Sequence, residues 1–265
     1  MGQRAIIAGS GRLPHLVAEA GVALMVRLQG QGVREDDIPL LNPTSIIDAR
    51  VERLGDMFDA LHAENVTEVC FAGAMTRVRF DLARLDHVTQ GLLPQIIAAQ
   101  GQGDDALLRE IVTIFTAQGF TIRGAAELRP DLVVQRGVLA GSKTHKTDAA
   151  RARAVLAALG PLDVGQAAVA ANGQMLGIET LQGTDAMLQF VTDTAPKSGG
   201  VLVKRAKTGQ DLRVDMPAIG PETIHRAANA GLAGIELQAG AVLLLDRQAV
   251  LTACAEAELN LWAVP

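Results

Sequence analysis

Short apolar runs alternate with segments of helical spacing along residues 1–140 of the chain. The runs have the length of buried strands, and glycines stand at the ends of several of them. A tight strand, Gly-containing loop, helix and strand at the start predict a parallel, Rossmann-like α/β sheet. The predicted elements are the strands Ala5–Ala8, Ala23–Leu28, Val66–Ala72 and Phe120–Ile122, and the helices Leu13–Ala20, Leu54–Ala63, Leu92–Ala99 and Asp105–Gln118.

The composition changes at the polar segment 140–146, which we take as a domain boundary. We therefore expect two α/β domains, residues 1–140 and 145–265. In the second, Asn172-Gly173 between two apolar runs predicts a hairpin, and hence a mixed sheet. The predicted elements are the helices Asp148–Leu159, Glu222–Ala230, Arg247–Leu259 and one that begins at Gly183, and the strands Gly165–Ala171, Met175–Glu179, Val201–Lys204, Gly234–Leu237 and Val242–Leu245, followed by a terminal strand.

Composition and charge narrow the class of protein. The net charge is −5, basic residues form no long stripe, and only 3% of residues are aromatic. This argues against a nucleic-acid partner. Cys70 and Cys254 lie in apolar segments, which favours buried free thiols over the alternative of a disulfide, and hence a reduced, cytoplasmic protein. Neither a secretory signal nor an apolar run of about 20 residues is present, so we expect any lipid to be met from the membrane surface.

Glycine-containing segments follow two of the predicted strands in the first half. Gly9, Ser10 and Gly11 come after the first strand, where backbone N–H groups at a strand-to-helix turn can approach a phosphate. The spacing lacks the full dinucleotide fingerprint, which excludes a standard NAD site. Gly73 and Thr76 follow a later strand, at the edge of the sheet where open α/β folds bind ligands. An ordinary turn is the alternative for each segment.

Carboxylates stand near predicted helix starts in both halves. Asp104 precedes the helix Asp105–Gln118, either as its N-cap or as a group that holds a cation or a ribose hydroxyl. In the second half Glu179 ends a strand, and Thr184 and Asp185 begin a helix. Such a turn can present two carboxylates and a hydroxyl to one point, as a hard divalent cation prefers. For Asp185 the alternative is an ordinary charge at a helix N-terminus.

Several cations precede an aspartate in an apolar setting. Lys204 and Lys207 come first, and Asp215 follows between Val214 and Met216. The lysines are suited to clamp a pyrophosphate while Asp215 binds a metal or activates water. A buried salt bridge of Asp215 is the alternative. The sequence contains no H-E-x-x-H, G-x-S-x-G or Walker A pattern, which argues against a zinc site, serine-type acyl hydrolysis and ATP hydrolysis.

Seven segments together resemble one family. They read AIIAGSGRLP, EVCFAGAMTR, GQGDDALLREI, LDVGQAAV, IETLQGTDAML, VLVKRAK and RVDMPAIGPETIHRAANAGLAGI. They are similar to motifs of the metal-dependent, non-calcineurin-like UDP-2,3-diacylglucosamine pyrophosphatases of lipid A biosynthesis. The resemblance runs from the first predicted strand to the last, and its C-terminal segments are long and in order.

The resemblance implies that UDP-2,3-diacylglucosamine lies in a cleft between the two domains. It implies hydrolysis to UMP and 2,3-diacylglucosamine 1-phosphate (lipid X), with Mg²⁺ or Mn²⁺ required. A cytoplasmic enzyme of this kind would meet its lipid transiently at the inner-membrane surface, and a homodimer is a further expectation. The alternatives are another nucleotide-sugar pyrophosphatase and a non-catalytic nucleotide- or lipid-binding protein.

The resemblance also implies roles for single residues. The essential aspartate of the family falls on Asp215, and we expect Glu179 and Asp185 to share the catalytic role. Asp215 and Asp185 are the expected metal ligands. The expected substrate-binding residues are Gly9, Ser10, Gly11, Gly73, Thr76, Asp104, Thr184, Lys204 and Lys207.

Overall fold

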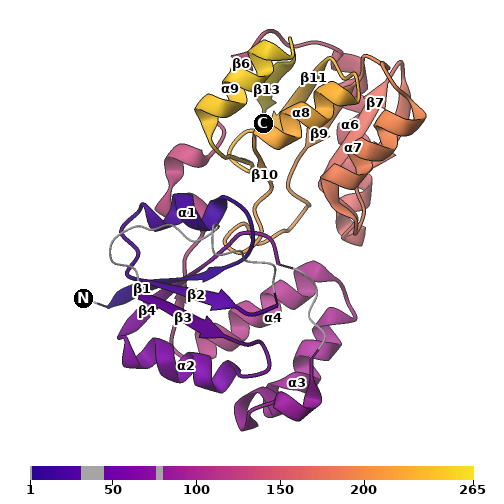
Figure 1. Cartoon of the computed structure of the whole chain (residues 1–265). Coiled ribbons are helices and arrows are strands. Elements are labelled where there is room, and N and C mark those ends of the chain that lie inside the picture. Colours follow the sequence, from indigo (N-terminus) through magenta and orange to yellow (C-terminus); the bar gives the residue numbers. More distant parts are fainter. Residues whose placement is uncertain (1, 31–44, 76–79) are drawn as a thin grey trace. The chain divides into compact units, whose positions relative to one another are not determined.

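The protein divides into two compact units (Figure 1), and a computed structural model describes residues 2–30, 45–75 and 80–265. The first unit comprises Met1–Pro130 and Arg213–Asp215, and the second comprises Asp131–Leu212 and Met216–Pro265. The division therefore lies earlier than the predicted segment 140–145. The reason is that strand β6 (Gly137–Ala140) pairs with the C-terminal strand of the second unit. The cleft expected between the two domains stays a prediction.

The first unit contains a five-stranded sheet in which every strand is parallel to its neighbours. The order is β3-β2-β1-β4-β5, the order of a doubly wound α/β fold, so the Rossmann-like prediction is confirmed. The strand order reverses between β1 and β4, where such folds bind ligands. The strands are β1 (Gln3–Ala8), β2 (Leu24–Leu28), β3 (Ser45–Ala49), β4 (Val66–Ala72) and β5 (Thr121–Ile122).

Helices cover both faces of this sheet. Residues of α2, α3 and α4 form one core cluster with the strands, in which Phe58 and Phe115 meet edge to face at 5.2 Å between ring centroids. The short α1 packs on the sheet through Leu16 and Val17, outside that cluster. The helices are α1 (Leu13–Ala18), α2 (Leu54–Ala63), α3 (His87–Gln100), α4 (Asp104–Ala117) and α5 (Ala125–Leu128).

The second unit contains a six-stranded mixed sheet, as predicted. The order is β6-β13-β11-β9-β7-β8. Strands β9, β11 and β13 are parallel, whereas β6 and β7 run antiparallel to their neighbours. The hairpin between β7 and β8 turns at Asn172 and Gly173, whose positive φ angles of 52° and 76° fit a type I′ turn. The strands not yet bounded are β7 (Ala167–Ala171), β8 (Gln174–Ile178), β9 (Val201–Lys204), β11 (Gly234–Gln238), β13 (Asn260–Val264) and a separate parallel pair, β10 (Ala218–Ile219) and β12 (Leu243–Leu244).

Two apolar layers enclose the second sheet. Helices α7, α8 and α9 pack on one face, and α6 packs on the other, over the buried Trp262. On the α6 side the buried carboxylate of Glu236 accepts hydrogen bonds from Trp262 Nε1 at 2.9 Å and from Arg153. The helices are α6 (Lys146–Leu159), α7 (Gly183–Thr194), α8 (Pro221–Asn229) and α9 (Arg247–Glu256).

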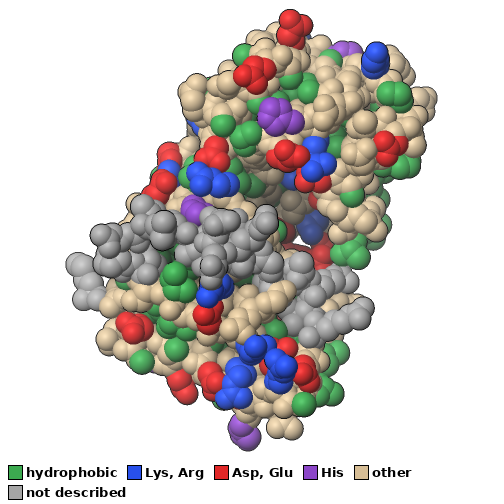
Figure 2. All heavy atoms as spheres, viewed as in Figure 1, with side chains coloured by type: hydrophobic (Ala, Val, Ile, Leu, Met, Phe, Trp, Pro, Cys, Tyr) green, Lys and Arg blue, Asp and Glu red, His purple; other side chains and the backbone are tan. Residues whose placement is uncertain are grey.

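The two cysteines and the surface charges can be compared with the expectations from the sequence. Cys70 and Cys254 are buried and free, as predicted. Figure 2 shows Lys and Arg side chains intermixed with Asp and Glu on the visible face. Among the described residues, no helix combines the length and apolar character needed to cross a bilayer.

Candidate active site

Two glycine loops at the carboxyl edge of the first sheet pack backbone against backbone. Ser10 N donates to Ala74 O at 2.8 Å, and Ala74 N donates to Ser10 O at 3.0 Å. Gly73 has a φ of +95°, and a Cβ there would lie 2.7 Å from the carbonyl carbon of Gly9. The structure therefore brings Gly9, Ser10 and Gly73 together at the point where the strand order reverses. Gly11 is exposed, with a φ of +93° and no described atom within 4 Å of a Cβ built on it.

The other first-half candidates are less closely tied to this edge. Asp104 is the first residue of α4, and the N-cap is Gly103, so the prediction of Asp104 as the N-cap is wrong by one position. Its exposed carboxylate lies where it complements the helix dipole, and the next residue, Asp105, pairs with Arg109. Thr76 lies outside the described residues.

Three predicted residues of the second unit form one hydrogen-bonded chain. Lys204 Nζ donates to Thr184 Oγ1 at 2.8 Å, and Thr184 Oγ1 donates to the carboxylate of Glu179. The three side chains come from the carboxyl end of β9, the first turn of α7 and the residue directly after β8. We call this group the Lys204 cluster.

The Lys204 cluster is built to hold a charge away from water. Lys204 is 8% exposed, because it lies on the same face of the sheet as Leu202 and its register partners Ala167 and Leu237, which belong to the apolar core. A buried ammonium group needs hydrogen-bond acceptors and a counter-charge, and Thr184 and Glu179 provide both. An ammonium beside a helix N-terminus is also a site where an anion is stabilised.

The remaining predicted groups of the second unit are engaged in ion pairs. Lys207 Nζ contacts the carboxylate of Asp163, and the backbone N–H of Lys207 donates to Gln210 at 2.8 Å. Asp185 is exposed and lies 3.3 Å from Nε of Arg226 on α8. Both side chains therefore already have a partner of opposite charge in the second unit.

Asp215 belongs to the first unit, although we grouped it with Lys204 and Lys207 along the sequence. Val214 packs against the core cluster of the first unit, and Asp215 is half-buried. The structure thus places Asp215 in a different compact unit from the Lys204 cluster.

The fit of a divalent cation depends on how many ligands the protein supplies. Among the described residues, no group of three or more His, Cys, Asp or Glu side chains is placed so that it could hold a metal ion. An all-protein cage, as Ca²⁺ or Zn²⁺ prefers, therefore does not fit those residues. A Mg²⁺ site with one or two carboxylates, water and substrate phosphates does fit, since it needs few protein ligands.

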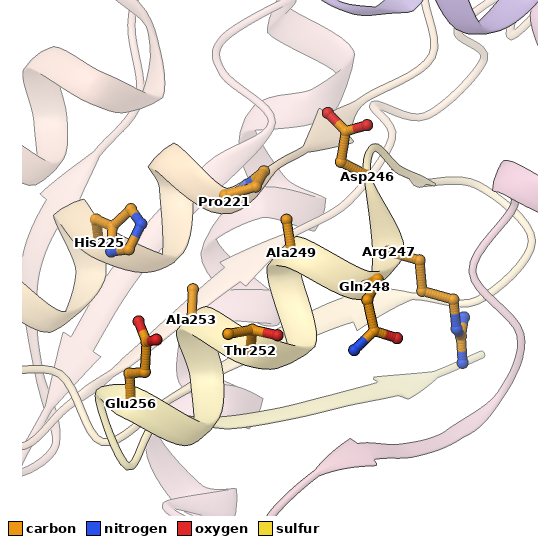
Figure 3. Close-up of a pocket in the computed structure, with 9 residues that line it drawn as sticks. All are labelled: Pro221, His225, Asp246, Arg247, Gln248, Ala249, Thr252, Ala253 and Glu256. Carbon is orange, nitrogen blue, oxygen red and sulfur yellow. The ribbon is translucent and has the colours of Figure 1, made fainter.

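A groove of about 670 Å³ lies between α8 and α9. His225 of α8 and Thr252 and Glu256 of α9 lie on its two sides (Figure 3). None of the predicted site residues is among those that line it. The groove is lined by Pro221, His225, Asp246, Arg247, Gln248, Ala249, Thr252, Ala253 and Glu256.

Sequence reasoning missed several residues that support the candidate site. Asp163 and Arg226 are partners of predicted residues but lie 44 and 41 positions away from them in the chain, too far for a local pattern to show. Gly124 lies against the Asp215 segment: a Cβ there would lie 3.1 Å from Cα of Arg213. Its position shortly after a strand end was the one signal that could have drawn attention to it.

The chain matches known proteins over nearly its whole length. Residues 3–132 match the LpxI N-terminal domain and residues 135–262 match the LpxI C-terminal domain. The chain is also 40% identical over 258 residues to the UDP-2,3-diacylglucosamine pyrophosphatase LpxI of Caulobacter vibrioides, covering 94% of this chain and 92% of that protein. The two domain matches fall on the two compact units, apart from the Arg213–Asp215 segment and the two residues Asp131 and Leu132. The chain therefore belongs to the LpxI family.

Proposed function

We propose that this protein hydrolyses the pyrophosphate bond of UDP-2,3-diacylglucosamine to UMP and lipid X, in lipid A biosynthesis. The observation that carries the proposal is the 40% identity, over 94% of the chain, to a UDP-2,3-diacylglucosamine pyrophosphatase. The Lys204 cluster supports it, because it offers a desolvated cation at a helix N-terminus to an anionic group.

Phosphoryl transfer to water depends on positioning and on neutralising charge rather than on covalent help from the protein. In this proposal Lys204 and the first turn of α7 bind phosphate oxygens. Thr184 holds the Lys204 ammonium and the Glu179 carboxylate in place. Lys207 keeps the loop after β9 ordered through Asp163, and a second role as a phosphate ligand is part of the proposal.

Asp215 is proposed to orient the attacking water or to ligate a divalent cation. A cation such as Mg²⁺ or Mn²⁺ would neutralise pyrophosphate oxygens, and Asp215 is the first candidate to hold it. Asp185 is the second candidate, although Arg226 already lies 3.3 Å from it. Gly9, Ser10, Gly11, Gly73, Thr76 and Asp104 remain the proposed contacts of the first unit with the substrate.

The test is release of UMP from UDP-2,3-diacylglucosamine by the purified full chain, with and without a chelator. We expect turnover that the chelator abolishes and that added Mg²⁺ or Mn²⁺ restores. Asp215→Ala should lose activity, whereas Asp193→Ala, which changes an exposed residue of α7, should retain it. Turnover unaffected by chelation would remove the metal from the proposal, and near-normal turnover by Asp215→Ala would remove Asp215.

The acyl chains of the substrate suggest where the enzyme works. We propose that it meets the lipid on the cytoplasmic surface of the inner membrane, without permanent insertion, and vesicle flotation with and without the substrate lipid checks this. A homodimer is proposed too, and sedimentation at several protein concentrations measures it.

Two further measurements separate the proposed function from its alternatives. Comparison of turnover with UDP-N-acetylglucosamine distinguishes the acylated substrate from nucleotide sugars in general. Substrate binding without UMP release would indicate a binding protein.

A further inference from the structure

The three-residue segment Arg213–Asp215 belongs to a different compact unit from the residues on either side of it. Leu212 before it and Met216 after it belong to the second unit, while the three residues themselves belong to the first. A short excursion of this kind is held by whatever contacts its residues make in the unit that they join. The position of Asp215 therefore depends on the contacts that this segment makes in the first unit.

Val214 provides the apolar part of this attachment. It is half-buried and packs against the core cluster that also contains Phe58, Phe115 and Ile122. The residues on either side of it, Arg213 and Asp215, are charged, so Val214 is the apolar member of the segment. Burying an apolar side chain stabilises its position in proportion to the area removed from water.

Gly124 provides a close backbone contact. A Cβ at this position would lie 3.1 Å from Cα of Arg213, which is tighter than most real contacts of a Cβ. The φ and ψ of Gly124 are −77° and 148°, which any residue adopts. A larger residue is therefore disfavoured here by the proximity of Arg213 and not by backbone conformation.

The attachment point lies at the carboxyl edge of the parallel sheet. Gly124 comes two residues after the end of β5, and the intervening Arg123 N donates to Val69 O of β4 at 2.9 Å. Because β1, β4 and β5 are parallel neighbours, this is the same edge that carries Gly9 and Gly73. Open α/β sheets bind ligands at that edge.

We propose that Val214 and Gly124 are positioning residues for Asp215. Val214 fixes the segment to the first-unit core, Gly124 sets how closely the backbone of Arg213 approaches the sheet, and the two contacts together set where the Asp215 carboxylate lies. This inference rests on the proposed hydrolysis and on the proposed role of Asp215 in it.

The first test compares Val214→Ala with Val51→Ala in the full chain. Val51 is a half-buried valine that packs against the same core cluster, in the turn between β3 and α2, so it is a matched control for lost packing. A displacement of about 1 Å at a reacting group can cost about 100-fold in rate, so we expect kcat of Val214→Ala to fall by about 10- to 100-fold. KM of Val214→Ala should change by less than about threefold. The conservative variant Val214→Ile keeps an apolar side chain there and should retain most of the kcat of the unaltered protein.

Equal kcat values for the two alanine variants, or a change in KM alone, would overturn the role of Val214. The failure of the underlying function gives a different result, because the unaltered protein would then release no UMP from UDP-2,3-diacylglucosamine. A urea unfolding curve of each variant, followed by circular dichroism, identifies any loss that comes from an unfolded first unit.

The second test compares Gly124→Ala with Gly91→Ala. The alanine at 124 adopts the native backbone angles but pushes Arg213 by a few tenths of an ångström. At Gly91, on α3, no described atom lies within 4 Å of an added Cβ. We expect Gly124→Ala to lower kcat and Gly91→Ala to leave it unchanged. If kcat of Gly124→Ala equals that of Gly91→Ala, the contact with Arg213 does not position Asp215.

A double substitution tests whether Val214 acts through Asp215. If it does, adding Val214→Ala to Asp215→Asn should cause no further loss of the residual kcat, because the group that Val214 positions is already gone. A further loss as large as in the unaltered protein would show that Val214 acts independently and would overturn the inference.

Discussion

Replacing Thr184 by valine removes one hydroxyl group from the centre of the Lys204 cluster. That hydroxyl accepts a hydrogen bond from Lys204 Nζ at 2.8 Å and donates one to the carboxylate of Glu179. Valine has nearly the same shape, so the change leaves the packing of the first turn of α7 in place. Lys204 is 8% exposed, so water has little access to replace the missing acceptor.

The size of the effect follows from the two hydrogen bonds. A bond that involves a charged group contributes about 1.5–3 kcal/mol, and the hydroxyl makes one to an ammonium and one to a carboxylate. Glu179 is only half-buried and recovers part of its loss from water. We therefore expect Thr184→Val to lower the free energy of unfolding of the second unit by about 2–3 kcal/mol. We also expect kcat/KM to fall by about tenfold or more, because the Lys204 ammonium is no longer held in one orientation.

Trp262 makes the second unit separately measurable. It is the single tryptophan of a chain without tyrosine, and it is buried in the core between α6 and the second sheet. Urea unfolding followed by tryptophan fluorescence therefore reports on this unit. The control is Thr192→Val on the same helix, whose hydroxyl donates to the carbonyl of Leu188 at 2.9 Å. That bond adds little to helix stability, so the control should change the free energy by at most about 0.5 kcal/mol.

Thr184→Ser keeps the hydroxyl and should retain most of both stability and kcat/KM. If Thr184→Val and Thr192→Val have the same free energy of unfolding and the same kcat/KM, the hydroxyl of Thr184 does not organise the cluster. A loss of stability alone, with kcat/KM unchanged, would leave the cluster as a structural element only.

The first unit supports three tests that use single residues. Burial raises the pKa of Asp86, but hydrogen bonds from Thr89 and from backbone N–H groups outweigh it and hold the pKa below its ordinary value of 3.8. The stability that Asp86 contributes is thus present above pH 3.8 and is lost as pH falls through the lower, folded-state pKa, so Asp86→Asn should reduce the loss of stability in acid, measured by urea unfolding. Burial raises the pKa of the Cys70 thiol to about 12, so iodoacetamide should label it at neutral pH only after unfolding, and rapid labelling of the folded protein would contradict this. Gly73→Ala should cost about 2–4 kcal/mol by thermal or urea unfolding, because it adds a backbone clash to the strain of a positive φ, whereas Gly11→Ala adds the strain alone and should cost less.

Local sequence patterns predicted the elements whose apolar residues form a clear run or a clear helical face. The helix Leu54–Ala63 and the strands Val66–Ala72 and Val201–Lys204 have the predicted bounds. Each strand is largely buried and reads as an apolar run, and the helix presents its apolar side to the sheet. The strand β3 was missed for the opposite reason. It lies at the edge of the sheet, and of its five residues Ala49 alone is buried, so neither an apolar run nor a clear alternation marks it.

The candidate site was predictable to the extent that its contacts are close in sequence or follow strand order. Glu179 and Thr184 are five positions apart, and Lys204 ends a strand of the same sheet. The separate placement of Asp215 was not predictable, because a three-residue excursion to the first unit has no periodicity of its own. Its one local sign is a valine between two charged residues, and many exposed loops contain that pattern.

The charges of the second unit bear on whether catalysis needs a cation. Lys204 faces Glu179 through Thr184, and Lys207 faces Asp163, so each lysine that could meet the pyrophosphate is already balanced by a carboxylate. An anionic pyrophosphate gains less net attraction from such balanced pairs than from two lone lysines, because each carboxylate repels the anion that its lysine attracts. Binding of the pyrophosphate is then favoured by one of two changes: further positive charge binds beside the carboxylates, or the lysines separate from them. A divalent cation bound together with the substrate meets the first requirement, and its charge would be the largest in the site. The chelator experiment therefore tests the proposed role of a cation in this charge balance, and metal-independent turnover would favour a lysine that leaves its carboxylate when the substrate binds.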